Sequence, residues 1–187
     1  MAINLPDEIR TPQAVARRAL ALFGVVGVAF GGDREVIIGW LRDNNLFDEL
    51  SPVEARFLVN PAPSKRQVVI AGWYSERLIV LAWALGLLAM PSPAEQCDTA
   101  LFQKMMPPYA EVEVDEFISS AQLRTSKELI AAADTILNEH WVARDAAIHN
   151  REPSAPVDLE VIQERHHAIN WIIGHEGLPW DEVTTDT

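Results

Sequence analysis

The chain has 187 residues, of which 49% are hydrophobic and six are tryptophans, and this composition fits one globular domain with a substantial core. The formal net charge of -12 argues against nucleic-acid binding, because affinity for the phosphate backbone comes from lysine and arginine. The start of the chain is polar and acidic, unlike a signal peptide, and the single cysteine, Cys97, cannot form an internal disulfide. We therefore expect a cytoplasmic protein whose acidic surface favours solubility or a basic partner.

Two apolar runs, residues 19–30 and 78–90, raise the question of a membrane span. Both are much shorter than the roughly 20 apolar residues that a transmembrane helix needs. We expect both to be core helices and the protein to have no membrane span.

Helix start signals recur along the first half of the chain. Thr11 precedes a proline, an N-cap followed by proline at the first helical position. The segments that start at Ser51 and Ser92 both read S-P-x-E, which predicts a capping box at the start of a helix. Ser64 is placed to cap a long helix over residues 64–90, which is apolar on most sides after its middle and is therefore predicted to be the buried centre of the fold.

The second half contains two more long helices, predicted over residues 126–148 and 157–174 and joined by a proline-containing connector, residues 151–156. No hairpin signal and no long run of alternating hydrophobicity is present. The predicted fold is an all-α, single-domain bundle of about six or seven helices around the central helix, with an N-terminal arm at residues 1–10 and a C-terminal tail, residues 175–187, packed on the domain.

Helical wheels place polar side chains among the apolar residues of three helices. His140 and Arg144 fall near the middle of an arc that also contains Leu129, Ala133, Ile136, Leu137, Ala143, Ala147 and Ile148. Arg165 lies within the apolar arc of residues 157–174, with Glu164 at its flank and Asn170 roughly opposite. Glu76 shares an apolar face of the central helix.

A buried guanidinium needs a carboxylate, and Glu76 is the first candidate, with Glu164, Asp134 and Asp145 as alternatives. We therefore predict a buried ion-pair network that joins the central helix to the two late helices. The predicted cluster, which is either structural or a ligand site, comprises Glu76, His140, Arg144, Asp145, Glu164, Arg165 and Asn170.

Signals for specific chemistry are sparse. Glu164 and His167 have the Glu-x-x-His spacing of metal ligands on one helix face, with His175 as a third candidate. The motif occurs once, and histidines at the surface or at the edge of the fold explain it better. Cys97 has no histidine assigned near it and is expected to be an ordinary buried cysteine. No phosphate-binding glycine loop or nucleophile motif is present, and we assign no catalytic residue and no cofactor.

Several short motifs together resemble a known family. They are Trp83-Ala-Leu-Gly86, His140-Trp141 with Asp145, Glu164-Arg165, Ala168-x-Asn170-Trp171, Trp180-Asp181 and Thr185-Asp-Thr187. This pattern resembles the bacterial domain-of-unknown-function family 4272, over most of the chain and most specifically in its last part. The resemblance implies a bacterial, cytoplasmic protein and no particular activity.

Two classes of function remain open from the sequence. The first is a non-catalytic protein-binding module, for example an acidic immunity protein that neutralises a basic toxin. The second is an enzyme or small-ligand binder that uses the polar cluster. A solvent-connected pocket at the cluster would favour the second class, and a sealed cluster would favour the first.

Overall fold

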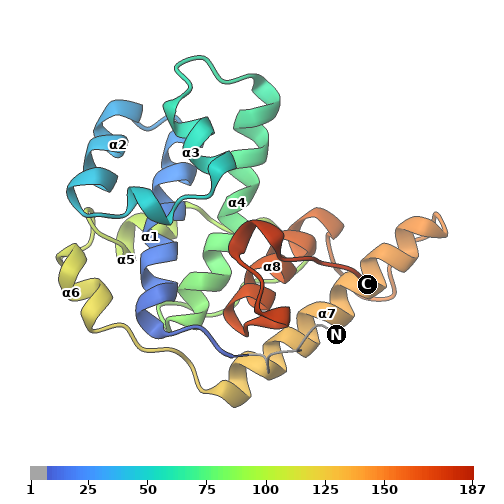
Figure 1. The fold of residues 1–187 in the computed structure, drawn as a ribbon. Coiled ribbons are helices and arrows are strands. Elements are labelled where there is room, and N and C mark those ends of the chain that lie inside the picture. The colour runs from blue at the N-terminus through green and yellow to red at the C-terminus, as the bar shows by residue number, and fades with distance from the viewer. Residues whose placement is uncertain (1–7) are drawn as a thin grey trace, which may run out of the picture.

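The computed structural model describes residues 8–187, which form eight α-helices and no β-strand (Figure 1). The α-helices are α1 (Pro12–Ala29), α2 (Arg34–Asp43), α3 (Pro52–Val59), α4 (Lys65–Ala84), α5 (Ala100–Met105), α6 (Val114–Ser119), α7 (Ser126–Ile148) and α8 (Leu159–Ile172). Three 3₁₀ helices, η1 (Phe47–Glu49), η2 (His175–Gly177) and η3 (Trp180–Glu182), complete the described elements. The predicted all-α class is confirmed, with eight α-helices in this part of the chain rather than six or seven. Residues 1–7 of the predicted N-terminal arm lie outside the described residues.

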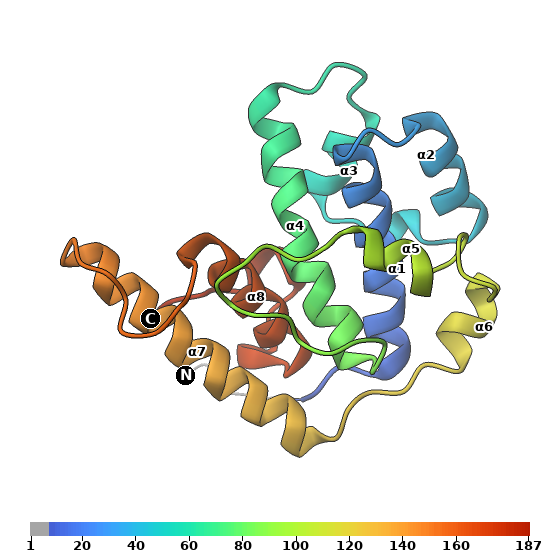
Figure 2. The same ribbon diagram turned by 180° about the vertical axis from the view of Figure 1, so that it is seen from behind.

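Helix α4 lies at the centre of the fold, as predicted. It packs against α1 on one side and against α8 on the other, while α2 and α3 contact α1, and α7 contacts α8 (Figures 1 and 2). After Arg77 it is apolar on all sides and mostly buried, with Leu78, Val80 and Leu81 at 0% exposure. The central position of α4 therefore follows from its composition.

Side-chain caps fix the starts of the helices. Thr11 caps α1 by accepting the N–H of Ala14 at 3.2 Å. Ser51 and Ser64 each form a reciprocal capping box with the third helical residue. The sequence predicted the box at Ser51 and predicted Ser64 as a helix cap. Each box satisfies two backbone donors that the first turn of a helix leaves without partners.

Helix α4 ends earlier than the predicted residue 90. Gly86 has φ +75°, in the left-handed region, and its N–H donates to Trp83 O at 2.9 Å. The N–H of Leu87 donates to Ala82 O at 3.0 Å, which completes a Schellman motif. The chain after α4 is therefore free to cross over α8 as an extended loop, visible in Figure 2.

The C-terminal part of α7 projects beyond the rest of the fold in both views (Figures 1 and 2). The chain then returns, and its last segment packs on α8, where Trp180 and Val183 are buried. None of the helices among residues 8–187 combines the length and the apolar character that a membrane span requires.

A close backbone contact joins the two ends of the described chain. The N–H of Arg10 donates to Ile172 O at 2.9 Å, at the end of α8. Gly174 has φ +72°, and a Cβ there would lie 2.1 Å from the carbonyl oxygen of Glu8. Only glycine fits this position, because both the conformation and the space exclude a side chain.

Candidate functional site

Arg165 and Glu76 form a fully buried ion pair between α8 and α4. Nε and Nη2 of Arg165 lie 2.9 Å and 2.8 Å from Oε2 of Glu76, and both side chains are 1% exposed. The other carboxylate oxygen of Glu76 accepts the N–H of Cys97 at 2.7 Å. The sequence prediction of a buried guanidinium paired with Glu76 matches this geometry.

The remaining donors of Arg165 hold the loop that follows α4. Nη1 donates to Pro91 O at 2.9 Å and to Ser92 O at 3.0 Å, and Nη2 donates to Glu95 O at 3.2 Å. The predicted capping box at Ser92 is wrong, since residues 92–95 form a turn and the next helix, α5, begins only at Ala100. In a helix that started at Ser92, these carbonyls would point along the helix axis, whereas here they converge on one guanidinium.

His140 is buried, as predicted, but it contacts another histidine rather than Glu76 or Arg165. Its Nδ1 lies 2.9 Å from Nδ1 of His166, so one ring donates and the other accepts. Burial lowers the pKa of both rings, and that of His166 falls to about 4, with the neighbouring His140 and His175 adding to the effect of burial. Both imidazoles are therefore neutral near pH 7.

Arg144 is exposed, and its predicted place in the buried cluster is wrong. Its Nη1 donates to Oγ1 of Thr187 at 3.3 Å, near the outer part of α7. The buried positions of α7 are Leu129, Ala133, Ile136, His140, Ala143 and Ala146. Arg144 lies beside this line of buried residues, and its side chain is exposed.

The other three members of the predicted cluster have separate partners. Glu164 pairs with Arg77 of α4, and Asp145 pairs with Arg151 and His149 near the end of α7. Asn170, which the helical wheel placed opposite the apolar arc, is 7% exposed because the C-terminal segment covers it. Its amide donates to Thr184 O at 3.0 Å. The seven residues thus do not form one site.

The metal candidates are also separated. Arg77 lies between Glu164, with which it forms an ion pair, and His167, whose Nε2 is 3.3 Å from Nη1 of Arg77. Burial, and then the charge of Arg77, lower the pKa of His167 to about 3. His175 lines a different surface hollow, and residues 8–187 contain no group of three potential ligands placed for a metal. Glu164 and His167 are a poor metal site, because the Arg77 guanidinium already occupies the place that a metal ion would take between them.

A second buried ion pair joins Arg18 of α1 to Glu54 of α3. The sequence analysis did not predict it, because helical wheels were considered for α4, α7 and α8 and not for α1. Their side chains are 3% and 1% exposed, and the guanidinium carbon of Arg18 lies 4.1 Å from the centre of the Trp180 ring. Glu54 also closes the capping box of Ser51. The sequence does contain a signal for this pair. Arg18 falls among the apolar residues of α1, so its buried guanidinium needs a carboxylate for the same reason as Arg165.

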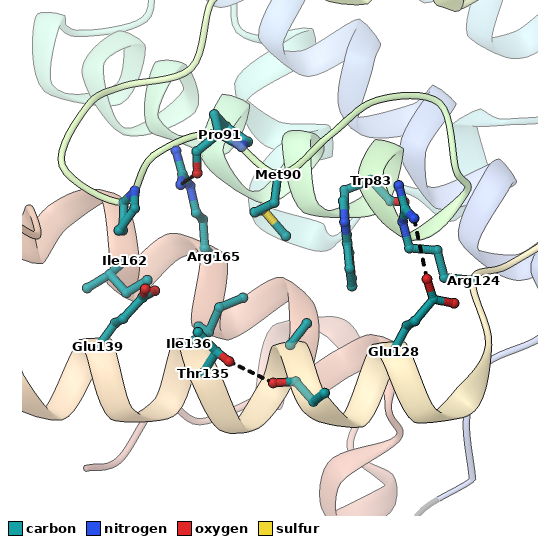
Figure 3. Close-up of a pocket in the computed structure, with 13 residues that line it drawn as sticks. Trp83, Met90, Pro91, Arg124, Glu128, Thr135, Ile136, Glu139, Ile162 and Arg165 are labelled. Carbon is teal, nitrogen blue, oxygen red and sulfur yellow. Dashed lines mark hydrogen bonds and ion pairs between the residues drawn. The ribbon is translucent and has the colours of Figure 1, made fainter.

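A groove of about 430 Å³ lies between one face of α7 and the loop that follows α4 (Figure 3). Its walls are mostly apolar, and the α7 face carries Glu128 toward one end and Glu139 toward the other. The lining residues are Trp83, Met90, Pro91, Pro93, Arg124, Glu128, Ala131, Ala132, Thr135, Ile136, Glu139, Ile162 and Arg165.

The two arginines of the groove are already engaged. Arg165 is held by Glu76 and the loop carbonyls. Arg124 donates to Trp83 O at 2.8 Å and Leu88 O at 3.0 Å, and its guanidinium carbon lies 5.0 Å from the centre of the Trp83 ring. Both therefore support the groove wall, with few donors left for a ligand.

Glu139 differs from every other charged group in the groove. Its carboxylate makes no hydrogen bond or ion pair with any of residues 8–187, although the side chain is half-buried. Burial raises its pKa, and only the charge of Arg165 opposes that rise. Figure 3 shows the carboxylate on the groove side of α7, without a partner. Sequence reasoning missed this residue, since the wheel of α7 was read for its apolar arc alone.

Cys97 is half-buried, and its thiol is expected to be unreactive. Its Sγ lies 3.5 Å from Ser75 O, and burial, followed by the charge of Glu76, raises the pKa of the thiol to about 12. A thiol with this pKa is a poor nucleophile at neutral pH, which agrees with the expectation of an ordinary cysteine.

Comparison with known protein families matches residues 4–183 to the family described as "Domain of unknown function (DUF4272)". The chain belongs to this family. Searches of curated proteins and of solved structures found no match. Membership confirms the resemblance seen in the short motifs and brings no activity with it.

Proposed function

We propose that this DUF4272 protein is a non-catalytic binding module, and that the groove between α7 and the post-α4 loop takes a basic side chain of a partner protein. In this proposal the lysine or arginine of the partner pairs with Glu139. The apolar part of that side chain and its neighbours lie on Trp83, Met90 and Ile162.

The observation that carries the proposal is the unpaired Glu139 carboxylate. A half-buried charge without a partner destabilises the free protein, so such a group is more often kept for binding than for folding. A long basic side chain suits the site, because its methylene stem covers apolar surface while its charge reaches the carboxylate.

The extent of the groove favours a protein segment over a small molecule. Glu128 and Glu139 are 11 residues apart on one face of α7, which corresponds to about 16 Å along the helix. The stretch between them presents small side chains, Ala131, Ala132 and Thr135, over which a chain can lie closely. The net charge of -12 would also speed the approach of a basic partner. A basic toxin neutralised by this protein is one specific form of the proposal.

The enzyme alternative depended on a common cluster of Glu76, His140, Arg144 and Arg165. Glu76 and Arg165 are sealed at 1% exposure, His140 pairs with His166, and Arg144 faces solvent. No nucleophile and general base are adjacent in this arrangement, and we therefore favour binding.

The experiment compares three immobilised proteins in an extract of the native host: the wild type, Glu139→Gln and Glu111→Gln. Glu111 is exposed, lies outside the groove and is a matched control for the loss of one charge. The proposal expects a basic protein that is retained by the wild type and by E111Q and is lost with E139Q. Equal retention by all three proteins, or retention of no basic protein, would contradict it.

A further inference from the structure

We infer that the outward face of α7 is a docking surface for a second copy of this chain, and that two α7 helices pack antiparallel across a two-fold axis. Four large apolar side chains lie exposed along this face: Ile130 at 51%, Leu137 at 43%, Trp141 at 54% and Ile148 at 71%. Monomeric proteins rarely leave an apolar stripe of this kind unpaired.

The four residues lie along one line of the helix. Their spacings of seven, four and seven residues keep them on one side of a helix, as in the seam of a coiled coil. The side that packs on α8 is a separate stripe, through Ala133, Ile136 and His140. Helix α7 therefore has one apolar face for its own fold and a second that the described chain leaves open.

The stripe is complementary to itself when it is reversed. In an antiparallel pair centred on position 139, Ile130 lies opposite Ile148 of the second copy, and Leu137 lies opposite Trp141. A two-fold axis repeats each contact, because residue i meets j and j meets i. All four apolar residues thus find apolar partners in a single register.

The charged positions of the stripe agree with the same register. Asp134 and Arg144 are exposed seam residues, and both are equally distant from position 139. In the antiparallel pair each Asp134 lies opposite Arg144 of the other copy, whereas a parallel pair would place like charges together. Asp134 has no hydrogen bond or ion pair within residues 8–187, and Arg144 makes only the 3.3 Å contact with Thr187.

The shape of the surface allows this contact. The C-terminal part of α7 projects from the fold, so a second helix can lie along it (Figures 1 and 2). A shallow hollow of about 340 Å³, bounded by Asp134, Leu137, Asn138, Trp141 and Thr187, lies where the Trp141 ring of the second copy would enter. The stretch from Ile130 to Ile148 is about 27 Å long, so the contact is a small interface, of the kind that dimerises weakly.

This dimer is independent of the proposed partner groove. Thr135 and Glu139, which line the groove, lie on the opposite side of α7 from Leu137. Dimerisation would leave two grooves open, and a partner with two basic segments would then bind more tightly than to one copy.

Sedimentation velocity of the purified full chain over a concentration series tests the inference. The wild type is expected to shift from monomer to dimer with concentration. Trp141→Asp should raise the dissociation constant by at least about tenfold. The control Val36→Asp, which adds a charge at an exposed valine of α2, should leave it unchanged.

Charge exchange tests the register. Asp134→Arg alone and Arg144→Asp alone each place like charges opposite one another and should weaken the dimer, while the double variant D134R/R144D should restore it. Far-ultraviolet circular dichroism and thermal unfolding check that each variant folds. A wild type that stays monomeric at several hundred micromolar (on the scale of such small interfaces), a dimer unaffected by W141D, or a double variant no better than the single ones would overturn the inference.

Discussion

Replacement of Arg165 by methionine is the sharpest test of what stabilises this fold. Methionine preserves much of the volume and removes five N–H···O contacts, two to Glu76 and three to the carbonyls of Pro91, Ser92 and Glu95. It also leaves the 1%-exposed Glu76 carboxylate with the N–H of Cys97 as its remaining partner. Removal of one member of a buried ion pair costs about 3–5 kcal/mol, a large share of the roughly 5–15 kcal/mol that stabilises a typical domain.

Urea unfolding followed by tryptophan fluorescence measures this cost. The matched control is Arg66→Met, an exposed arginine whose loss should change the free energy of unfolding by less than about 0.5 kcal/mol. Glu76→Gln combined with R165M removes both charges, so the double variant should lose less stability than the sum of the two single losses, by at least about 2 kcal/mol. If R165M cost less than about 1 kcal/mol, or no more than R66M, the central place of this ion pair would be refuted.

Three further predictions concern individual residues. The pKa of His166 is lowered to about 4, so the folded state binds fewer protons than the unfolded state below the ordinary pKa of 6.5, and stability should fall as the pH drops from 6.5 toward 4. Unfolding midpoints at several pH values should show this decline, with a smaller slope for His166→Asn. Gly174→Ala should destabilise the fold by about 1–3 kcal/mol, because a Cβ would meet the Glu8 backbone and φ is positive. The control Gly39→Ala, in open space within α2, should stabilise the fold slightly or leave it unchanged. Equal shifts of the unfolding temperature in the two variants would contradict this prediction. Cys97, with its pKa raised to about 12, should react with iodoacetamide at pH 7.5 much more slowly than free cysteine, and a rate near that of free cysteine would be inconsistent with its burial.

Much of the helical framework could be predicted because its signals are local. A cap depends on residues three positions apart, and so Ser51 and Ser64 were read correctly from the sequence. Ser92 carries the same pattern and forms a turn, because Arg165, more than 70 residues away, binds the carbonyls there. A four-residue motif carries no information about a distant guanidinium that binds the carbonyl groups of the same segment.

The predicted cluster failed in part for a geometric reason. The apolar arc drawn on α7 merged two stripes, one that packs on α8 and one that is exposed through Leu137 and Ile148. Arg144 was placed inward because it lies near the merged arc's centre. Asn170 was placed outward because a wheel of α8 does not include the C-terminal segment that covers it. The Glu76–Arg165 pair could be predicted, since a guanidinium on a fully apolar face has few possible partners.

Glu139 offers the most direct test of the proposed function, because the account predicts opposite effects on stability and on binding. Burial raises the pKa of Glu139, so its ionised form destabilises the fold above the ordinary carboxyl pKa, and E139Q should be at least as stable as the wild type at pH 7. The decisive measurement is the dissociation constant of the basic partner recovered from the native host, determined by calorimetry for the wild type, E139Q and E111Q. Binding should be at least about tenfold weaker for E139Q and nearly unchanged for E111Q. Equal affinity of E139Q and the wild type would contradict it.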